Sequence, residues 1–328
     1  MSDTMARGAA VLGVGAYRPR RVVSNEEICE RIDSTDEWIT TRTGITSRRW
    51  AEPDETLDHM ATAAATEALE AAELDPAALG MILVASCTDV QPIQPLGVRV
   101  AARLGTEVPA LSINATCAGF CYGLGLARDL VRGGTADHVL VVGAERLSEV
   151  TDHDDRGTAF IFADGAGAFV VGRSHEDAIG PVVWGSDGVR GEVLRLTPDW
   201  NAFRDDRSLG TPVISMQGRR VFKWAAEEMP KAAGAACKAA GVGIGDIDVF
   251  VPHQANHRIT EAIVKALELR DDVVVADDIV TTGNTSSASI PLAVHRLRAE
   301  GRVQRGDRAL LVGFGGGLAY AAQVVVLP

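Results

Sequence analysis

The chain has 328 residues, of which 46% are hydrophobic and 23% charged, so it can bury a large globular core. Its net charge of −12 argues against a nucleic-acid-binding protein, which needs a basic surface. The sequence has no uncharged run of the roughly 18 residues that span a membrane, no long apolar run at its start, and five cysteines in no disulfide framework, so we expect a cytoplasmic protein without membrane contact.

Apolar runs of strand length alternate with helical patterns along the whole chain. The runs predicted to be buried strands lie at 81–86, 110–116, 138–145, 166–172, 247–253 and 309–315. The stretches predicted to be helices lie at 56–74, 120–134 and 219–241. This alternation predicts an α/β fold with a mostly parallel, helix-covered sheet.

A repeated spacing indicates that the chain consists of two similar halves. Gly143 and Gly313 each end a similar apolar run, and they are 170 residues apart (313 − 143). The predicted helix starts after Cys117 and Asn284 are 167 residues apart (284 − 117). We therefore predict two halves, residues 1–173 and 174–328.

Cys117 lies between an apolar run and a predicted helix that begins near Ala118. A strand-to-helix turn presents a nucleophile at the positive end of a helix dipole, which favours the thiolate, and its backbone N–H groups can form part of an oxyanion hole. From its position alone, Cys117 could equally be a small buried hydrophobic residue. The other four cysteines lack this setting and are expected to be structural.

His253 follows a buried run at a strand end, where ligands of α/β proteins usually bind. His257 lies four residues later, a spacing that can bind zinc, but no Glu follows His253 and no third ligand stands at a motif spacing, so we expect no metal site. A structural, hydrogen-bonded histidine remains an alternative.

Asn284 opens a polar segment before a helix, and it could simply be a turn residue. The segment GFGGG (313–317) would allow close approach of the backbone to a reacting atom. It fails the dinucleotide pattern G-x-G-x-x-G because Leu318 takes the last glycine position, so we expect no nicotinamide cofactor.

Taken together, these segments resemble the β-ketoacyl-acyl-carrier-protein synthase III family of the thiolase superfamily. The matching motifs run in family order over nearly the whole chain. They are DEWI (36–39), TRTGI (41–45), NATCAGF (114–120), DRGT (155–158), FADGAGA (162–168), PHQAN (252–256), GNTS (283–286) and GFGGG (313–317). The resemblance implies a five-layered α-β-α-β-α fold of two duplicated halves, usually a homodimer.

The resemblance also implies a reaction and catalytic residues. Cys117 would take an acyl group from an acyl-CoA starter, and a decarboxylative Claisen condensation with malonyl-acyl carrier protein would follow, initiating fatty-acid or polyketide chains. His253 and Asn284 would stabilise the enolate, and the N–H groups of Cys117 and Gly316 would form the oxyanion hole. Phe314 would be an apolar wall against the malonyl carboxylate, and no cofactor would be needed.

Further residues match family positions that bind substrates. Those for the coenzyme A nucleotide are Trp38, Arg42, Arg156 and Arg258. Those for docking the acyl carrier protein are Lys223, Arg258 and Lys265.

Two departures from the family pattern concern the acyl group. Thr116 stands where Ala or Gly is usual, and Ile93 stands where family members often have Thr or Phe. In this family the segment 87–96 reaches the acyl pocket of the partner subunit, so Ile93 is the expected gate of that pocket. Two alternative functions remain open: an acyltransferase that passes the acyl group to an alcohol or a carrier protein without condensation, and a non-catalytic dimerising homologue.

Overall fold

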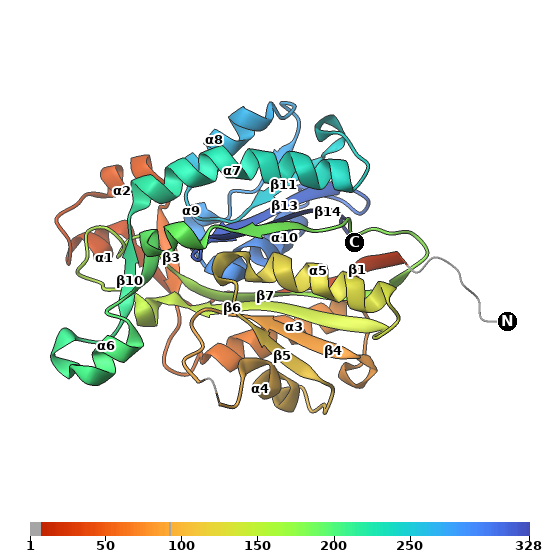
Figure 1. The fold of residues 1–328 in the computed structure, drawn as a ribbon, viewed down its shortest axis with the longest axis horizontal. Coiled ribbons are helices and arrows are strands. Elements are labelled where there is room, and N and C mark those ends of the chain that lie inside the picture. The colour runs from red at the N-terminus through yellow and green to blue at the C-terminus, as the bar shows by residue number, and fades with distance from the viewer. Residues whose placement is uncertain (1–7, 92) are drawn as a thin grey trace.

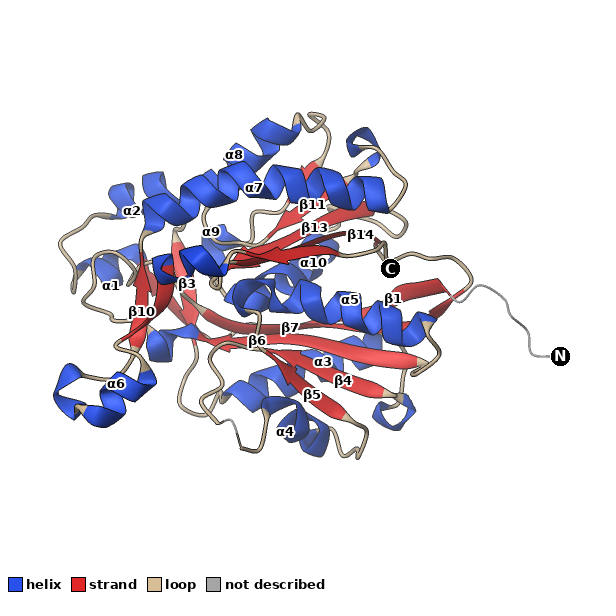
Figure 2. Cartoon of the chain, in the orientation of Figure 1, coloured by secondary structure: helices blue, strands red, loops and turns tan. Residues whose placement is uncertain are grey.

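The computed structural model describes residues 8–91 and 93–328 as five layers of helices and sheets (Figures 1 and 2). Helices α3 (Leu57–Ala71) and α4 (Leu96–Arg103) cover the outer face of one sheet. Helices α7 (Gly218–Ala239) and α8 (His257–Leu267) cover the outer face of the other. The predicted five-layered architecture is confirmed.

The first sheet belongs to the N-terminal half and has the order β1-β7-β6-β4-β5. Its strands are β1 (Gly8–Tyr17), β4 (Met81–Ala85), β5 (Ala110–Ile113), β6 (His138–Arg146) and β7 (Asp164–Ser174). Here β4 runs parallel to β5 and β6, whereas β7 runs antiparallel to β6 and β1.

The second sheet repeats this plan with strands of the C-terminal half, in the order β12-β11-β13-β14-β8. Its strands are β8 (Val183–Ser186), β11 (Val249–Pro252), β12 (Val274–Val275), β13 (Arg308–Gly315) and β14 (Ala319–Val326). As in the first sheet, one strand has two parallel neighbours: β11 runs parallel to β12 and β13. The strand β14 runs antiparallel to β13 and β8. The expectation of mostly parallel sheets is therefore wrong, because β1, β7, β8 and β14 add antiparallel pairings that apolar runs alone do not distinguish.

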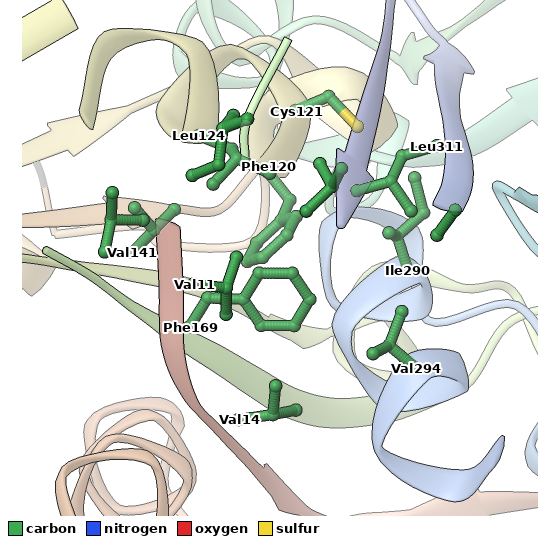
Figure 3. Close-up of a cluster of buried hydrophobic side chains, with 14 of the residues drawn as sticks. Val11, Val14, Phe120, Cys121, Leu124, Val141, Phe169, Ile290, Val294 and Leu311 are labelled. Atoms are coloured by element: carbon green, nitrogen blue, oxygen red, sulfur yellow. The ribbon is translucent and has the colours of Figure 1, made fainter. Parts of the chain in front are cut away.

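Two helices form the middle layer between the sheets. They are α5 (Gly119–Arg132) and α10 (Ser289–Ala299), one from each half. Phe120 on α5 packs edge-to-face on Phe169 of β7 with ring centroids 4.9 Å apart, and Ile290 of α10 and Leu311 of β13 belong to the same buried cluster (Figure 3). This shared core fixes the N-termini of both middle helices, where the site residues lie.

Smaller elements border the site. The N-terminal ones are β2 (Arg21–Ser24), α1 (Asn25–Cys29), α2 (Asp36–Thr43) and β3 (Ser47–Trp50). The C-terminal ones are β9 (Leu194–Thr197), α6 (Trp200–Asp205), β10 (Val213–Met216) and α9 (Ile279–Thr282). The ribbon of β9 and β10 was not predicted. No described helix is long and apolar enough to cross a membrane. The boundary at residues 173 and 174 coincides with the end of β7 and stays a prediction.

Candidate active site

Cys117 lies in a short 3-10 helix (Thr116–Ala118) that leads from β5 into α5, as the sequence predicted. Thr116 has a φ of 47°, and its backbone N–H donates to Asn114 Oδ1 at 3.1 Å. The Thr116 hydroxyl donates to the Gly316 carbonyl at 2.7 Å. The unusual Thr116 thus joins the turn that carries the nucleophile to the glycine loop of the other half.

The glycine loop after β13 lies directly against Cys117. A Cβ atom on Gly315 would lie 2.7 Å from both Cβ and Sγ of Cys117, a distance that side chains do not tolerate. Only glycine allows this approach of the loop backbone to the sulfur. The loop can therefore present N–H groups at the nucleophile.

His253 follows β11 and is buried, with 2% of its surface exposed. Its Nδ1 lies 2.7 Å from the Ser289 hydroxyl oxygen, which also accepts the Gln254 backbone N–H at 3.3 Å. The Ser289 hydroxyl can donate to Nδ1, which leaves the ring proton on Nε2. Phe314 packs edge-on against the imidazole with centroids 5.3 Å apart.

Asn284 is buried, with 5% of its surface exposed, and its amide is oriented by the backbone that follows. Its Oδ1 accepts the Ser286 N–H at 2.9 Å, so the Nδ2 group is the donor that remains for the cavity. Asn284, His253, Phe314 and Cys117 line the same cavity of about 520 Å³. The structure therefore brings together the three predicted catalytic side chains and Phe314.

Burial acts against the charged forms of the two ionisable catalytic side chains, Cys117 and His253. Burial raises the pKa of the Cys117 thiol to about 11, although hydrogen bonds with the Ser286 side chain and with the N–H groups of Gly316 and Cys117 lower it. Burial lowers the pKa of His253 to about 3. Burial thus opposes the thiolate that the helix N-terminus favours at Cys117, and it opposes the imidazolium form of His253.

The wall of this cavity includes most residues assigned to coenzyme A. Trp38, Arg42 and Arg258 line it. The guanidinium groups of Arg42 and Arg156 lie 5.8 and 5.4 Å from the Trp38 ring, so the indole is flanked by two cations that suit phosphate groups. Arg219 also lines the cavity and was missed, because nothing in its local sequence distinguishes it from other helix-surface arginines.

Cys117 also borders a second, smaller cavity of about 200 Å³. Its apolar lining comes from Leu147, Val150, Phe162, Leu194, Leu196 and Ile214. Cys87 lines it too, although we expected this cysteine to be structural. Ile93, the expected gate, lines neither cavity of the single chain and is 91% exposed.

The remaining predicted residues lie away from the cavities. Lys223 is on α7, with its side chain 77% exposed and 3.9 Å from Glu227. Lys265 is in the last turn of α8, the helix whose first turn carries Arg258. Within residues 8–91 and 93–328, no group of three or more His, Cys, Asp or Glu residues could hold a metal ion.

Comparison with known proteins assigns the family. Two models of 3-oxoacyl-[acyl-carrier-protein (ACP)] synthase III match, one over residues 111–188 and the C-terminal one over residues 237–327. This chain belongs to the 3-oxoacyl-[acyl-carrier-protein] synthase III family.

Relatives match over nearly their whole length. A beta-ketoacyl-[acyl-carrier-protein] synthase III of Streptomyces glaucescens is 50% identical over 98% of this chain and 96% of its own. The mycobacterial synthase III of Mycobacterium avium is 52% identical over 97% of this chain and 95% of its own. The crystal structure of the priming beta-ketosynthase from the R1128 polyketide biosynthetic pathway has a TM-score of 0.97 and 48% identity, covering 100% of this chain and 98% of that one. The protein is therefore a condensing enzyme of the synthase III type.

Proposed function

We propose that this synthase loads an acyl group from acyl-CoA onto Cys117 and condenses it with malonyl-acyl carrier protein, starting a fatty-acid or polyketide chain. The observation that carries the proposal is the convergence of Cys117, His253 and Asn284 on one cavity beside the glycine loop. The sulfur attacks the thioester carbonyl, and the N–H groups of Cys117 and Gly316 bind the oxyanion.

The second half-reaction uses the other two side chains. After the CoA thiol leaves, the malonyl thioester oxygen accepts hydrogen bonds from His253 Nε2 and Asn284 Nδ2, and the buried Phe314 ring faces the departing carboxylate. Loss of carbon dioxide leaves an enolate held by two neutral donors, and its carbon attacks the Cys117 thioester. Because these donors balance the charge in a water-poor site, the step needs neither metal nor cofactor.

The substrates are proposed from the shape and charge of the site. The nucleotide of coenzyme A is assigned to Trp38, Arg42, Arg156 and Arg258, and the acyl chain to the 200 Å³ apolar cavity. The carrier protein is acidic in our proposal and docks on Arg258, Lys223 and Lys265. The reaction is proposed to occur in the cytoplasm.

A homodimer is proposed on the edge of the first sheet. β5 is the edge strand of that sheet, and it carries Leu111, 51% exposed. Val98 of α4 is 46% exposed, and Ile93 lies in the segment between β4 and α4. An unpaired edge with apolar side chains is an element that a second copy can cover, and it would bring Ile93 to the partner's acyl cavity.

The test is a condensation assay with purified acyl-CoA, malonyl-acyl carrier protein and the synthase. We expect carbon dioxide and β-ketoacyl-carrier protein in equal amounts, and the control Cys117→Ala should form no β-ketoacyl-carrier protein. Acyl transfer to the carrier protein without loss of carbon dioxide would instead identify a simple acyltransferase.

A further inference from the structure

Arg18 follows β1 in the N-terminal half, and its side chain contacts the C-terminal half of the chain. Its guanidinium forms a bidentate pair with Asp278, with 3.1 Å from Nη1 to Oδ2 and 3.0 Å from Nη2 to Oδ1. The Asp278 side chain is 2% exposed, so the carboxylate is shielded from water. A bidentate pair of this kind fixes the relative orientation of the two side chains as well as their separation.

The same guanidinium contacts the chain on both sides of the turn that carries Asn284, residues 284–288. Nη1 donates to the Thr282 hydroxyl at 2.8 Å, and Nη2 donates to the Leu292 carbonyl at 3.0 Å. Asp278 and Thr282 lie at the two ends of α9, the helix that precedes the turn, and Leu292 lies in α10, which follows it. One side chain therefore holds the segments that lead into the turn and out of it.

The single residue between Thr282 and Asn284 is tightly enclosed. Gly283 has a φ of 74°, and a Cβ atom there would lie 2.9 Å from the Cβ of Ala163. Next to it, the Asn284 N–H donates to the Ile161 carbonyl at 2.9 Å, and the Ala163 N–H donates to the Asn284 carbonyl at 2.9 Å. Because the backbone is confined here, a shift of Thr282 would be passed on to Asn284 and not absorbed by a flexible loop.

We propose that Arg18 is a positioning residue for the enolate step, holding α9 and α10 so that the Asn284 amide meets the malonyl thioester oxygen. Arg18 lines neither cavity that Cys117 borders, so it acts through the turn and not on the substrate. The donors assigned to acylation are the N–H groups of Cys117 and Gly316, which lie outside the segment that Arg18 holds. Loss of Arg18 should therefore impair decarboxylation and condensation more than acylation.

Arg18→Lys is the first test, because lysine keeps the positive charge but lacks the planar fork that reaches several acceptors at once. The buried Asp278 carboxylate keeps a second cation, since Arg296 Nη1 lies 3.4 Å from its Oδ1, so the variant should still fold. We expect decarboxylation of malonyl-carrier protein to slow by about 10- to 10²-fold, with the loss in kcat and not in KM. Acylation of Cys117 by acetyl-CoA, followed by intact-protein mass, should stay close to wild type.

A second variant and a control accompany it. Thr282→Val removes one acceptor of Arg18 and keeps the shape of the side chain, so it should show the same selectivity with a smaller loss. The control is Arg128, in the second half of α5, whose side chain is 10% exposed and donates to the Ile179 carbonyl at 2.6 Å and to Asp177 Oδ2 at 3.0 Å. Arg128→Lys should lower the melting temperature but leave both half-reactions close to wild type.

A double-mutant cycle with Asn284→Ala separates positioning from general stabilisation of the fold. If Arg18 acts through the Asn284 amide, adding Arg18→Lys to Asn284→Ala should slow decarboxylation by less than about twofold more. Independent effects would multiply in the double variant, and that result would overturn the inference. Equal losses of acylation and decarboxylation in Arg18→Lys would overturn it too, as would a wild-type rate of decarboxylation in that variant.

The inference rests on the proposed role of Asn284, and the other samples distinguish the two failures. A wild-type enzyme that acylates but does not decarboxylate malonyl-carrier protein would refute the proposed function and this inference together. A wild-type enzyme that decarboxylates, an Asn284→Ala variant that is impaired and an Arg18→Lys variant that is not would overturn only the role of Arg18.

Discussion

Two turns of the molecule share one backbone design but differ in chemistry. In the nucleophile turn, residues 114–118, Asn114 Oδ1 accepts the N–H of Thr116, whose φ is 47°. In the amide turn, residues 284–288, Asn284 Oδ1 accepts the N–H of Ser286, whose φ is 48°. Each turn continues through a 3-10 helix into a middle-layer helix.

The difference lies in what surrounds each turn. Cys117 is the residue of the first turn that meets the glycine loop, and Ser287 holds the same place in the second, where it binds Glu145. Asn284 is buried against the cavity, whereas Asn114 is exposed. The duplicated halves therefore have two equivalent helix starts with different side chains. One turn carries the nucleophile Cys117, and the other carries the hydrogen-bond donor Asn284.

The largest effect should come from the nucleophile turn itself. Cys117→Ala removes the sulfur, so acylation by acyl-CoA should be abolished, while malonyl-carrier protein decarboxylation should persist because its donors lie in the other half. Intact-protein mass and carbon dioxide release measure the two steps separately. An acyl mass increment that survives denaturation of the variant would contradict the assignment.

The two asparagines provide a matched pair of substitutions. Asn284→Asp keeps the oxygen that accepts the Ser286 N–H but removes the donor and adds a negative charge, so condensation should fall by about 10²- to 10³-fold with acylation largely kept. Asn114→Asp makes the same change in the nucleophile turn, where Asn114 borders the acyl cavity, so its effect should fall on acylation and leave malonyl-carrier protein decarboxylation within about threefold of wild type. Equal losses in both variants would mean that Asn284 only shapes its turn.

The buried strands, the positions of the three catalytic residues and the duplication could be predicted from the sequence. Buried strands read as apolar runs, and Cys117, His253 and Asn284 each stand where such a run or a helix begins or ends. The 170-residue spacing of Gly143 and Gly313 already indicated the duplication that the strand orders confirm.

Other features depend on contacts between distant segments. Cys87 and Glu145 are 58 residues apart, and only the pairing of β4 with β6 in the first sheet brings them together. The raised pKa of Cys117 likewise results from its burial in the folded chain. Local sequence carries no signal for either.

A smaller effect is expected at Ile93, whose side chain contributes to neither cavity of its own chain. If it gates the partner's acyl cavity, Ile93→Ala should favour longer acyl-CoA starters and Ile93→Phe should favour acetyl-CoA. Each methylene of misfit is worth about 1–3 kcal/mol, so the shift should be graded. An unchanged ranking of starters in kcat/KM would show that the segment does not gate the cavity.

The smallest effect concerns pH. Because burial lowers the pKa of His253 to about 3, the imidazole stays neutral far below the ordinary histidine range. Decarboxylation by Cys117→Ala should therefore change by less than about twofold from about pH 8 to about pH 5. A fall with a midpoint near the ordinary histidine value would contradict the buried, neutral imidazole.

The assignment of acylation to the nucleophile turn and of condensation to the amide turn is tested most directly by intact-protein mass spectrometry in a two-step experiment. The synthase is first mixed with a panel of acyl-CoAs and then with malonyl-acyl carrier protein. We predict an acyl mass increment on Cys117 that disappears in the second step, with one β-ketoacyl-carrier protein formed for each acyl group lost. An increment on another residue, or an acyl-enzyme that persists while malonyl-carrier protein remains intact, would contradict the account.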